Sequence, residues 1–261
     1  MTVIKKYPRG DDNNFDEWVK KIKAKNVNWA LWGGWFDSDG SFSVRRGIKG
    51  AAQYYVKLSL RDRDPVELFS KTFETSLTYN EYRTTTPNGQ QYTAKTYNGI
   101  LRGKRGLWFV DQIKKYILQK TIWLKPFLEE SNIQYQSYSE AWTREEWVCY
   151  ITTLLEGDGT VYDRTITSKK YPAIFSNKNY FLNHVIKELK KFNIAHFNDP
   201  VISSVCTRKD GTKSNGYTIR LKGGKNIKNF YETILPFMTM DRKKQKVINN
   251  LKWMNRSDEM E

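Results

Sequence analysis

A short pattern that occurs twice constrains the fold of this chain more than any other feature. The first copy is Trp32–Gly40 (WGGWFDSDG) and the second is Ile151–Gly159 (ITTLLEGDG). Each copy closes an apolar run of helical length with the order acid-x-Asp-Gly, and the two final aspartates, Asp39 and Asp158, are 119 residues apart. A repeated helix that ends in a carboxylate predicts a doubled fold, in which two copies of one unit build a shared acidic site.

The order of strand and helix signals after each Asp-Gly also repeats. In the first half, the pattern predicts strands at 41–46 and 53–61, a helix at 65–73, strands at 77–84 and 92–102, and a helix at 107–119. In the second half, it predicts strands at 160–165 and 172–176, a helix at 180–192, strands at 201–208 and 217–222, and a helix at 227–235. The predicted fold class is therefore α+β, with two pseudo-twofold-related αββαββα half-domains, antiparallel sheets, and the motif helices paired at the interface.

The boundaries of the two half-domains follow from the same repeat. The prediction is an N-terminal extension at 1–26, a first half-domain at 27–122, a linker at 123–142, a second half-domain at 143–256 and a tail at 257–261. The extension is polar and charged, and the sequence assigns no role to it.

Both motif helices are predicted to carry a face of small residues. Residues at spacings of three, four and seven share one face of a helix. On the first helix that face holds Ala30, Gly33, Gly34 and Asp37, and on the second it holds Cys149, Thr152, Thr153 and Glu156. Because glycine inside a helix costs about 1 kcal/mol relative to alanine, two adjacent glycines indicate that another helix approaches closely.

The ends of the motif helices have their own signals. Thr143–Glu146 (TREE) fits a capping box at the start of the second helix. Gly40 and Gly159 are expected to end the two helices in a left-handed conformation. Pairing the helices through their small faces would bring Asp39 and Asp158 together.

Two carboxylates at helix C-termini repel each other, and each also interacts unfavourably with the negative end of its helix dipole. A divalent cation removes this conflict, and carboxylate oxygens with water suit Mg²⁺. The paired motifs therefore predict a magnesium site.

The sheets are predicted to have one apolar and one basic face. In the second strand Val56, Leu58 and Leu60 point one way, while Lys57, Ser59 and Arg61 point the other way. The chain has 44 Lys and Arg against 28 Asp and Glu, a net charge of +16 and a pI near 9.6. A basic, aromatic-rich chain of this kind favours nucleic acid as partner.

Other compartments and cofactors are disfavoured. The sequence has no apolar run long enough to span a membrane and no signal-peptide core near Met1, so no membrane partner and no secretion are expected. Cys149 and Cys206 do not have zinc-site spacing to His184 or His196. An intracellular location is predicted.

At residues 28–255 the chain resembles the LAGLIDADG homing endonucleases, specifically the monomeric kind with two motifs in one chain. The resemblance implies saddle-shaped sheets and catalytic metals bound by Asp39 and Asp158, with the backbone carbonyls of Ser38 and Gly157 as further ligands. It also implies a lysine after the fourth strand of each half, five residues before an aromatic residue. Lys104 and Lys225 have that spacing from Phe109 and Phe230.

The function that the resemblance implies is site-specific cleavage of double-stranded DNA by a monomer. The reaction would be Mg²⁺-dependent hydrolysis of phosphodiester bonds in a long asymmetric target, leaving 3′ overhangs. Side chains on the basic sheet faces would contact the DNA, and the candidates are Ser41, Ser43, Arg45, Arg46, Lys57, Ser59, Arg61, Arg63, Thr160, Tyr162, Arg164, Arg208, Thr218, Arg220 and Lys222.

Two other functions remain open from the sequence. One is an RNA-binding maturase that acts on intron RNA, and the other is a DNA-binding regulator that does not cut. Retention of both motif acids argues against the regulator. Asp62, Asp64, Ser176 and Asn177 are alternative candidates for a supporting polar residue after the second strand.

Overall fold

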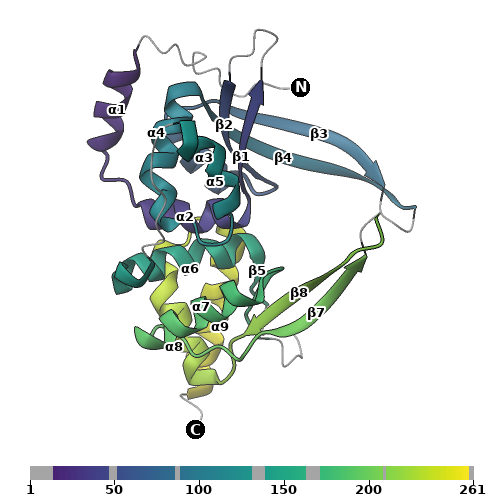
Figure 1. Cartoon of the computed structure of the whole chain (residues 1–261). Coiled ribbons are helices and arrows are strands. Elements are labelled where there is room, and N and C mark those ends of the chain that lie inside the picture. The colour runs from purple at the N-terminus through teal and green to yellow at the C-terminus, as the bar shows by residue number, and fades with distance from the viewer. Residues whose placement is uncertain are drawn as a thin grey trace. The chain divides into compact units, whose positions relative to one another are not determined.

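The structure is a computed structural model that describes residues 14–46, 52–85, 89–130, 139–162, 171–207 and 210–258. These residues form two compact units (Figure 1). The first unit contains residues 14–29 and 39–130, and the second contains Ala30–Ser38 and residues 139–258. The motif helix α2 (Trp29–Ser38) therefore groups almost entirely with the second unit.

The first unit has the predicted order of strands and helices. Its elements are α1 (Phe15–Lys23), β1 (Gly40–Arg46), β2 (Ala52–Leu60), α3 (Arg63–Thr72), β3 (Leu77–Thr85), β4 (Gln91–Arg102), α4 (Gly103–Ile113), the 3₁₀ turn η2 (Lys114–Tyr116) and α5 (Thr121–Glu130). The four strands form one antiparallel sheet in the order β1-β2-β4-β3. Helices α3 and α4 pack against β2 and β4 (Figure 1).

The core of the first unit lies between this sheet and its helices. Val56, Leu58 and Leu60 are buried, as the alternation in β2 predicts. Opposite them, the rings of Phe69, Phe73 and Phe109 form an aromatic cluster. The centroid of Phe73 lies 5.0 Å from that of Phe69 and 5.0 Å from that of Phe109. Aromatic rings bury large areas and favour tilted and edge contacts of this kind.

Two helices lie outside the predicted pattern of the first half. Helix α1 falls in the segment predicted as an extension, yet its Trp18 and Ile22 are buried, and Trp18 Nε1 donates to the carbonyl of Phe73 at 2.9 Å. Phe15, Trp18, Val19 and Ile22 have the i, i+3, i+4, i+7 spacing of an amphipathic helix. The helix signal is therefore present in the sequence, although the segment lies outside the repeat. Helix α5 runs into the segment predicted as a linker and buries Leu124 and Phe127.

The second unit repeats the order of the first. Its elements are α2, the 3₁₀ turn η3 (Ser139–Ala141), α6 (Arg144–Asp158), β5 (Gly159–Thr160), β6 (Ala173–Ser176), α7 (Asn179–Lys191), β7 (Val201–Thr207), β8 (Lys213–Arg220), α8 (Gly224–Ile234), the 3₁₀ turn η4 (Leu235–Phe237) and α9 (Asp241–Asp258). The sheet is again antiparallel, in the order β5-β6-β8-β7. Of the predicted strand at 160–165, residues 163–165 lie outside the described residues, and β5 ends at Thr160.

The start of α6 is confirmed and its end is corrected. Thr143 Oγ1 accepts from the Glu146 amide, and a Glu146 carboxylate oxygen accepts from the Thr143 amide, which is a capping box. Gly159 is extended, with φ −109°, so the predicted left-handed end is wrong. A Cβ on Gly159 would lie 2.6 Å from the carbonyl oxygen of Leu155. Glycine is therefore required here by close packing and not by its backbone angles.

The α+β fold class is confirmed in the part of the chain that the structure describes. Each unit carries a four-stranded antiparallel sheet and its helices in the predicted order. None of the helices within the described ranges combines the length and the apolar character that crossing a membrane requires.

Candidate active site

Each motif aspartate lies where a motif helix meets the edge strand of a sheet. Asp39 directly follows α2 and precedes Gly40, the first residue of β1. Asp158 is the last residue of α6 and precedes Gly159, the first residue of β5. Both aspartates are partly exposed. Each unit thus presents a partly exposed aspartate at the edge of its sheet, although Oδ2 of Asp39 is itself buried.

A lysine ammonium lies next to each of these junctions. Lys120 Nζ donates to the carbonyl oxygen of Gly40 at 2.7 Å, and Lys243 Nζ donates to the carbonyl oxygen of Gly159 at 2.7 Å. Lys243 also donates to the carbonyl oxygens of Leu155 and Glu156 in the last turn of α6. The ammonium group of Lys243 thus pairs with carbonyl groups that have no partner within the helix, and its positive charge offsets the negative end of the dipole of α6.

Lys104 and Lys225 lie at the starts of α4 and α8, the helices that follow the fourth strand of each sheet. In the first sheet Gly40 pairs with Leu58, and Leu58 pairs with Gly99 on β4. Lys104 comes five residues after Gly99 and is exposed in the first turn of α4. Lys225 is likewise exposed in the first turn of α8.

Sequence reasoning missed Lys120 and Lys243 because their spacing is irregular. Each follows the 3₁₀ turn that closes the last helix of the repeat, but the two lysines are 123 residues apart while the aspartates are 119 apart. A search for a constant offset therefore does not pair them. The 3₁₀ turn followed by a lysine is the signal that could have found them.

The predicted small faces of α2 and α6 contact each other within the second unit. A Cβ on Gly34 would lie 2.2 Å from Thr153 Oγ1 and 2.2 Å from the carbonyl oxygen of Tyr150. Thr153 Oγ1 donates across the contact to the carbonyl oxygen of Leu31 at 2.7 Å. The remaining members of the two faces, Ala30, Gly33, Cys149 and Thr152, are buried. Gly34 thus leaves room for the hydroxyl of Thr153.

The other acid of each motif is buried and held by hydrogen bonds. Tyr150 donates its hydroxyl to Asp37 at 2.6 Å. Glu156 accepts from the backbone amides of Thr239 and Met240 at 2.9 and 2.6 Å, and from the hydroxyl of Thr239 at 2.9 Å. Burial raises the pKa of Glu156 to about 7, against the lowering effect of these bonds and of Lys243. These two acids brace the helices and do not face solvent.

Asp39 and Asp158 each supply the type of donor that a hard divalent cation prefers. Both supply carboxylate oxygen, the ligand type that Mg²⁺ prefers, and Mg²⁺ commonly takes one or two protein carboxylates together with substrate phosphates and water. Within the described ranges no group of three or more acidic, cysteine or histidine side chains could hold a metal by itself. A metal at these acids would therefore depend on phosphate, water and backbone oxygens, such as those of Ser38 and Gly157, for its other ligands.

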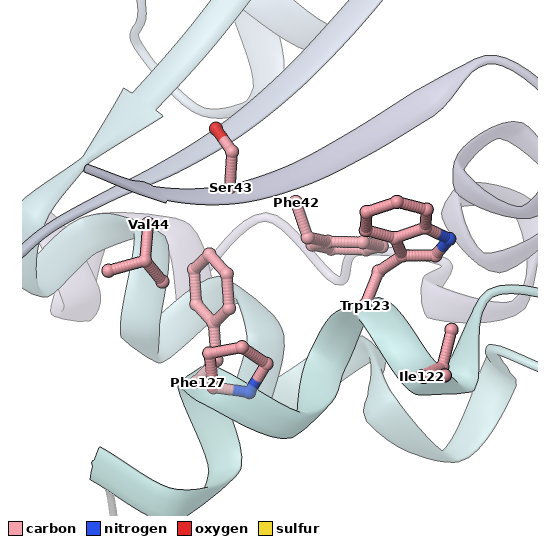
Figure 2. A pocket seen from close by; sticks show the side chains of 7 residues that line it. Phe42, Ser43, Val44, Ile122, Trp123 and Phe127 are labelled. Carbon is pink, nitrogen blue, oxygen red and sulfur yellow. The ribbon is translucent and has the colours of Figure 1, made fainter.

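The predicted DNA contacts mostly lie on the sheet faces that the helices leave open. Figure 2 shows Ser43 on the opposite side of β1 from Phe42 and Val44, which face α5. The exposed or partly exposed candidates are Ser41, Ser43, Arg45, Lys57, Ser59, Arg61, Arg63, Thr160, Tyr162, Arg220 and Lys222. Arg164, Arg208 and the side chain of Arg46 lie outside the described residues.

Several of these candidates differ from the simple expectation. Four of them lie outside the strands: Arg61, Arg63, Tyr162 and Lys222. Arg63 begins α3 and pairs with Glu67 at 2.9 Å. Thr218 is on the open face of its strand but only 1% exposed. Tyr55 and Arg102 also lie on the open face, although they are not among the contacts predicted from the sequence. The ring of Tyr55 lies 5.0 Å from the guanidinium group of Arg45 and 5.5 Å from that of Arg102. Strand alternation gives the face of a residue, but not how deeply its neighbours cover it.

A separate cavity lies behind β1. It has a volume of about 470 Å³ and is lined by Phe42, Ser43, Val44, Ile122, Trp123, Pro126 and Phe127 (Figure 2). Its lining contains no acid, base or thiol, so it lacks the groups that hydrolysis of a phosphodiester needs.

Comparison with known proteins supports the fold. No protein-family model matches the sequence, and no curated protein matches it significantly. The structure is similar to that of the I-LtrWI LAGLIDADG homing endonuclease bound to target DNA, at a TM-score of 0.52 and 13% identity over 93% of each chain. It also matches a single-residue variant of I-DmoI in complex with its target DNA in the presence of Mg, at a TM-score of 0.49 and 14% identity, over 84% of this chain and 98% of that one.

The LAGLIDADG meganuclease I-AabMI bound to uncleaved DNA matches at a TM-score of 0.49 and 9% identity, over 88% of this chain and 92% of that one. At such identities the likeness concerns the fold. The repeated αββαββα order, the two four-stranded sheets and the I-LtrWI match agree: this chain has the two-domain fold of the monomeric LAGLIDADG homing endonucleases.

Proposed function

We propose that this chain is a site-specific endonuclease that cuts double-stranded DNA as a monomer with the help of Mg²⁺. The observation that carries the proposal is the repeated junction of acid, glycine and lysine. In each unit the motif aspartate precedes a glycine whose carbonyl accepts a hydrogen bond from a lysine at 2.7 Å. Two such junctions in one chain suit a reaction on two DNA strands.

In the proposed reaction Asp39 and Asp158 would hold the divalent cations. When bound, the cation supplies Lewis-acid activation and neutralises charge on the phosphate. We assign the positioning of the acids to Lys120 and Lys243, in preference to Lys104 and Lys225, because each holds the residue that follows one of the acids. Their charge also favours an approaching phosphate.

The open sheet faces would bind the DNA. Their Arg and Lys side chains suit phosphates and guanine edges, and their hydroxyl groups suit other base edges. Since the two sheets carry different side chains, the expected target is long and asymmetric. The resemblance further implies 3′ overhangs as the product.

The test is cleavage of a randomised duplex library with and without Mg²⁺, by the wild type, Asp39→Asn and Asp158→Asn. Asp16→Asn, an exposed acid on α1, is the matched control. We expect the wild type and the control to enrich the same site only with metal. Each motif variant should lose about 100-fold or more in double-strand cutting, a change of about 3 kcal/mol in the barrier.

Wild-type cutting that persists in Asp39→Asn or Asp158→Asn would contradict the assigned roles. Tight DNA binding with no cutting under any divalent metal would favour a regulator, and preferential binding of intron RNA would favour a maturase.

A further inference from the structure

Asn98 is a polar side chain buried on the open face of the first sheet. It lies on β4, paired with Ser59 of β2 on one side and with Thr78 of β3 on the other. Ser59 belongs to the face opposite Leu58 and Leu60, so Asn98 faces away from the helices. Although this face is predicted to meet DNA, Asn98 is only 2% exposed.

One end of the Asn98 amide is fixed and the other is not satisfied. Ser59 Oγ donates to Asn98 Oδ1 at 2.6 Å, a length typical of a hydroxyl bonded to oxygen and short for an amide nitrogen. Nδ2 has no hydrogen-bond partner among the described residues. Buried donors in folded proteins are nearly always paired, so a donor left over needs a reason.

The second sheet has the same feature at the equivalent position. In the first sheet Gly40, Leu58 and Gly99 form one row across β1, β2 and β4, and Asn98 precedes the last of them. In the second sheet Gly159, Ile174 and Ile219 form that row, and Thr218 precedes Ile219. Thr218 is 1% exposed, and its hydroxyl also has no partner within the described part of the chain.

We propose that Asn98 and Thr218 read base edges, one in each half of the DNA target. The inference rests on the proposed nuclease function and adds to it the residues that set specificity. Because Ser59 holds Oδ1, Asn98 presents the two N–H groups of Nδ2. Major-groove acceptors that match them are N7 of a purine, O6 of guanine and O4 of thymine, while cytosine offers only a donor.

Approach of DNA would uncover Asn98. Lys57 on β2 and Arg61, just after the end of β2, lie two residues on either side of Ser59, and both have long side chains that can turn towards phosphates. Two strand spacings of about 4.8 Å separate β4 from Gly40, so Asn98 lies roughly 10 Å across the sheet from the residue after Asp39. The base that it reads is therefore expected in the inner part of its half-site.

The test compares base preferences across the whole target, by library cleavage with the wild type, Asn98→Asp, Ser59→Ala and Thr218→Val. Asp replaces the donor by an acceptor at nearly constant shape. Asn183→Asp, on the exposed side of α7, is the control for the added negative charge.

We expect Asn98→Asp to shift preference at one inner base pair towards cytosine or adenine by about ten-fold. Ser59→Ala should relax the same position, because the amide can then turn, and Thr218→Val should relax one position in the other half-site. The control should cut with the wild-type preference. If Asn98→Asp does not fold, Ser59→Ala and Thr218→Val still decide the question.

Variants that cut with the wild-type preference at every position would overturn the assignment while leaving the nuclease function intact. A wild type that cuts no sequence with any divalent metal would instead overturn the proposed function, and this inference with it.

Discussion

Glu156 is a buried acid whose pKa is raised by its surroundings. Its side chain is 1% exposed and accepts three hydrogen bonds from Thr239 and Met240. Thr239 in turn accepts from Trp35 Nε1 at 3.2 Å, so the carboxyl group is joined through Thr239 to α2. Burial disfavours the charged form more than these donors favour it, which raises the pKa to about 7.

This raised pKa predicts a pH-dependent stability. Between about pH 4.5 and 7 the folded chain binds the Glu156 proton more tightly than the unfolded chain does. The contribution of Glu156 to the free energy of unfolding is therefore complete below its pKa in the unfolded chain. It is lost as pH rises through its pKa in the folded chain. The measurement is the free energy of unfolding between pH 5 and 8 in the presence of a metal chelator. Over this range the value for the wild type should fall by about 3 kcal/mol more than the value for Glu156→Gln.

Gln suits this test because it resembles the protonated carboxyl group. Glu145→Gln, an exposed change in the first turn of the same helix, should keep the wild-type pH dependence. Equal pH slopes for the wild type and Glu156→Gln would show that Glu156 titrates normally.

At the scale of elements, the contact of α2 with α6 depends on the absence of a side chain at Gly34. A Cβ there would meet Thr153 Oγ1 and the backbone oxygen of Tyr150, each at 2.2 Å. Backbone cannot move aside cheaply, so Gly34→Ala must push the helices apart. We expect a loss of about 1–3 kcal/mol in the free energy of unfolding, measured in urea.

The matched control for this change is Gly224→Ala, at the start of α8. A Cβ at Gly224 would meet no atom within 4 Å. Alanine is also the better helix former, so this control should be neutral or slightly stabilising. A Gly34→Ala protein as stable as the control would mean that the two helices do not pack as the structure shows.

At the scale of the whole molecule, the net charge of +16 predicts binding that depends strongly on salt. Each phosphate neutralised by Lys or Arg releases counterions, and the slope of log affinity against log salt is about −0.9 for each contact. Affinity for duplex DNA should fall about 10³-fold or more between 50 and 200 mM salt. Arg220→Gln, on the open face of β8, should reduce the slope by about one contact.

Lys187→Gln removes the same charge from the exposed side of α7, away from the sheet, and should leave the slope unchanged. Equal effects of the two variants would mean that the chain binds DNA through its overall charge and not through the sheet face.

The sequence by itself determined the features that depend on local periodicity. The doubled order of strands and helices, the apolar face of β2 and the capping box at Thr143 all follow from residues close together in the chain. The two motif aspartates could also be named, because each ends a helix-length apolar run.

Only the tertiary structure decided what depends on contacts between distant segments. It placed Lys120 and Lys243 beside Gly40 and Gly159, showed that packing and not a left-handed angle selects Gly159, and found Trp18 buried in a charged segment. It also showed that Asn98 and Thr218 are covered on the open faces. Periodicity tells which way a side chain points, but burial and hydrogen-bond partners come from residues that only folding brings near.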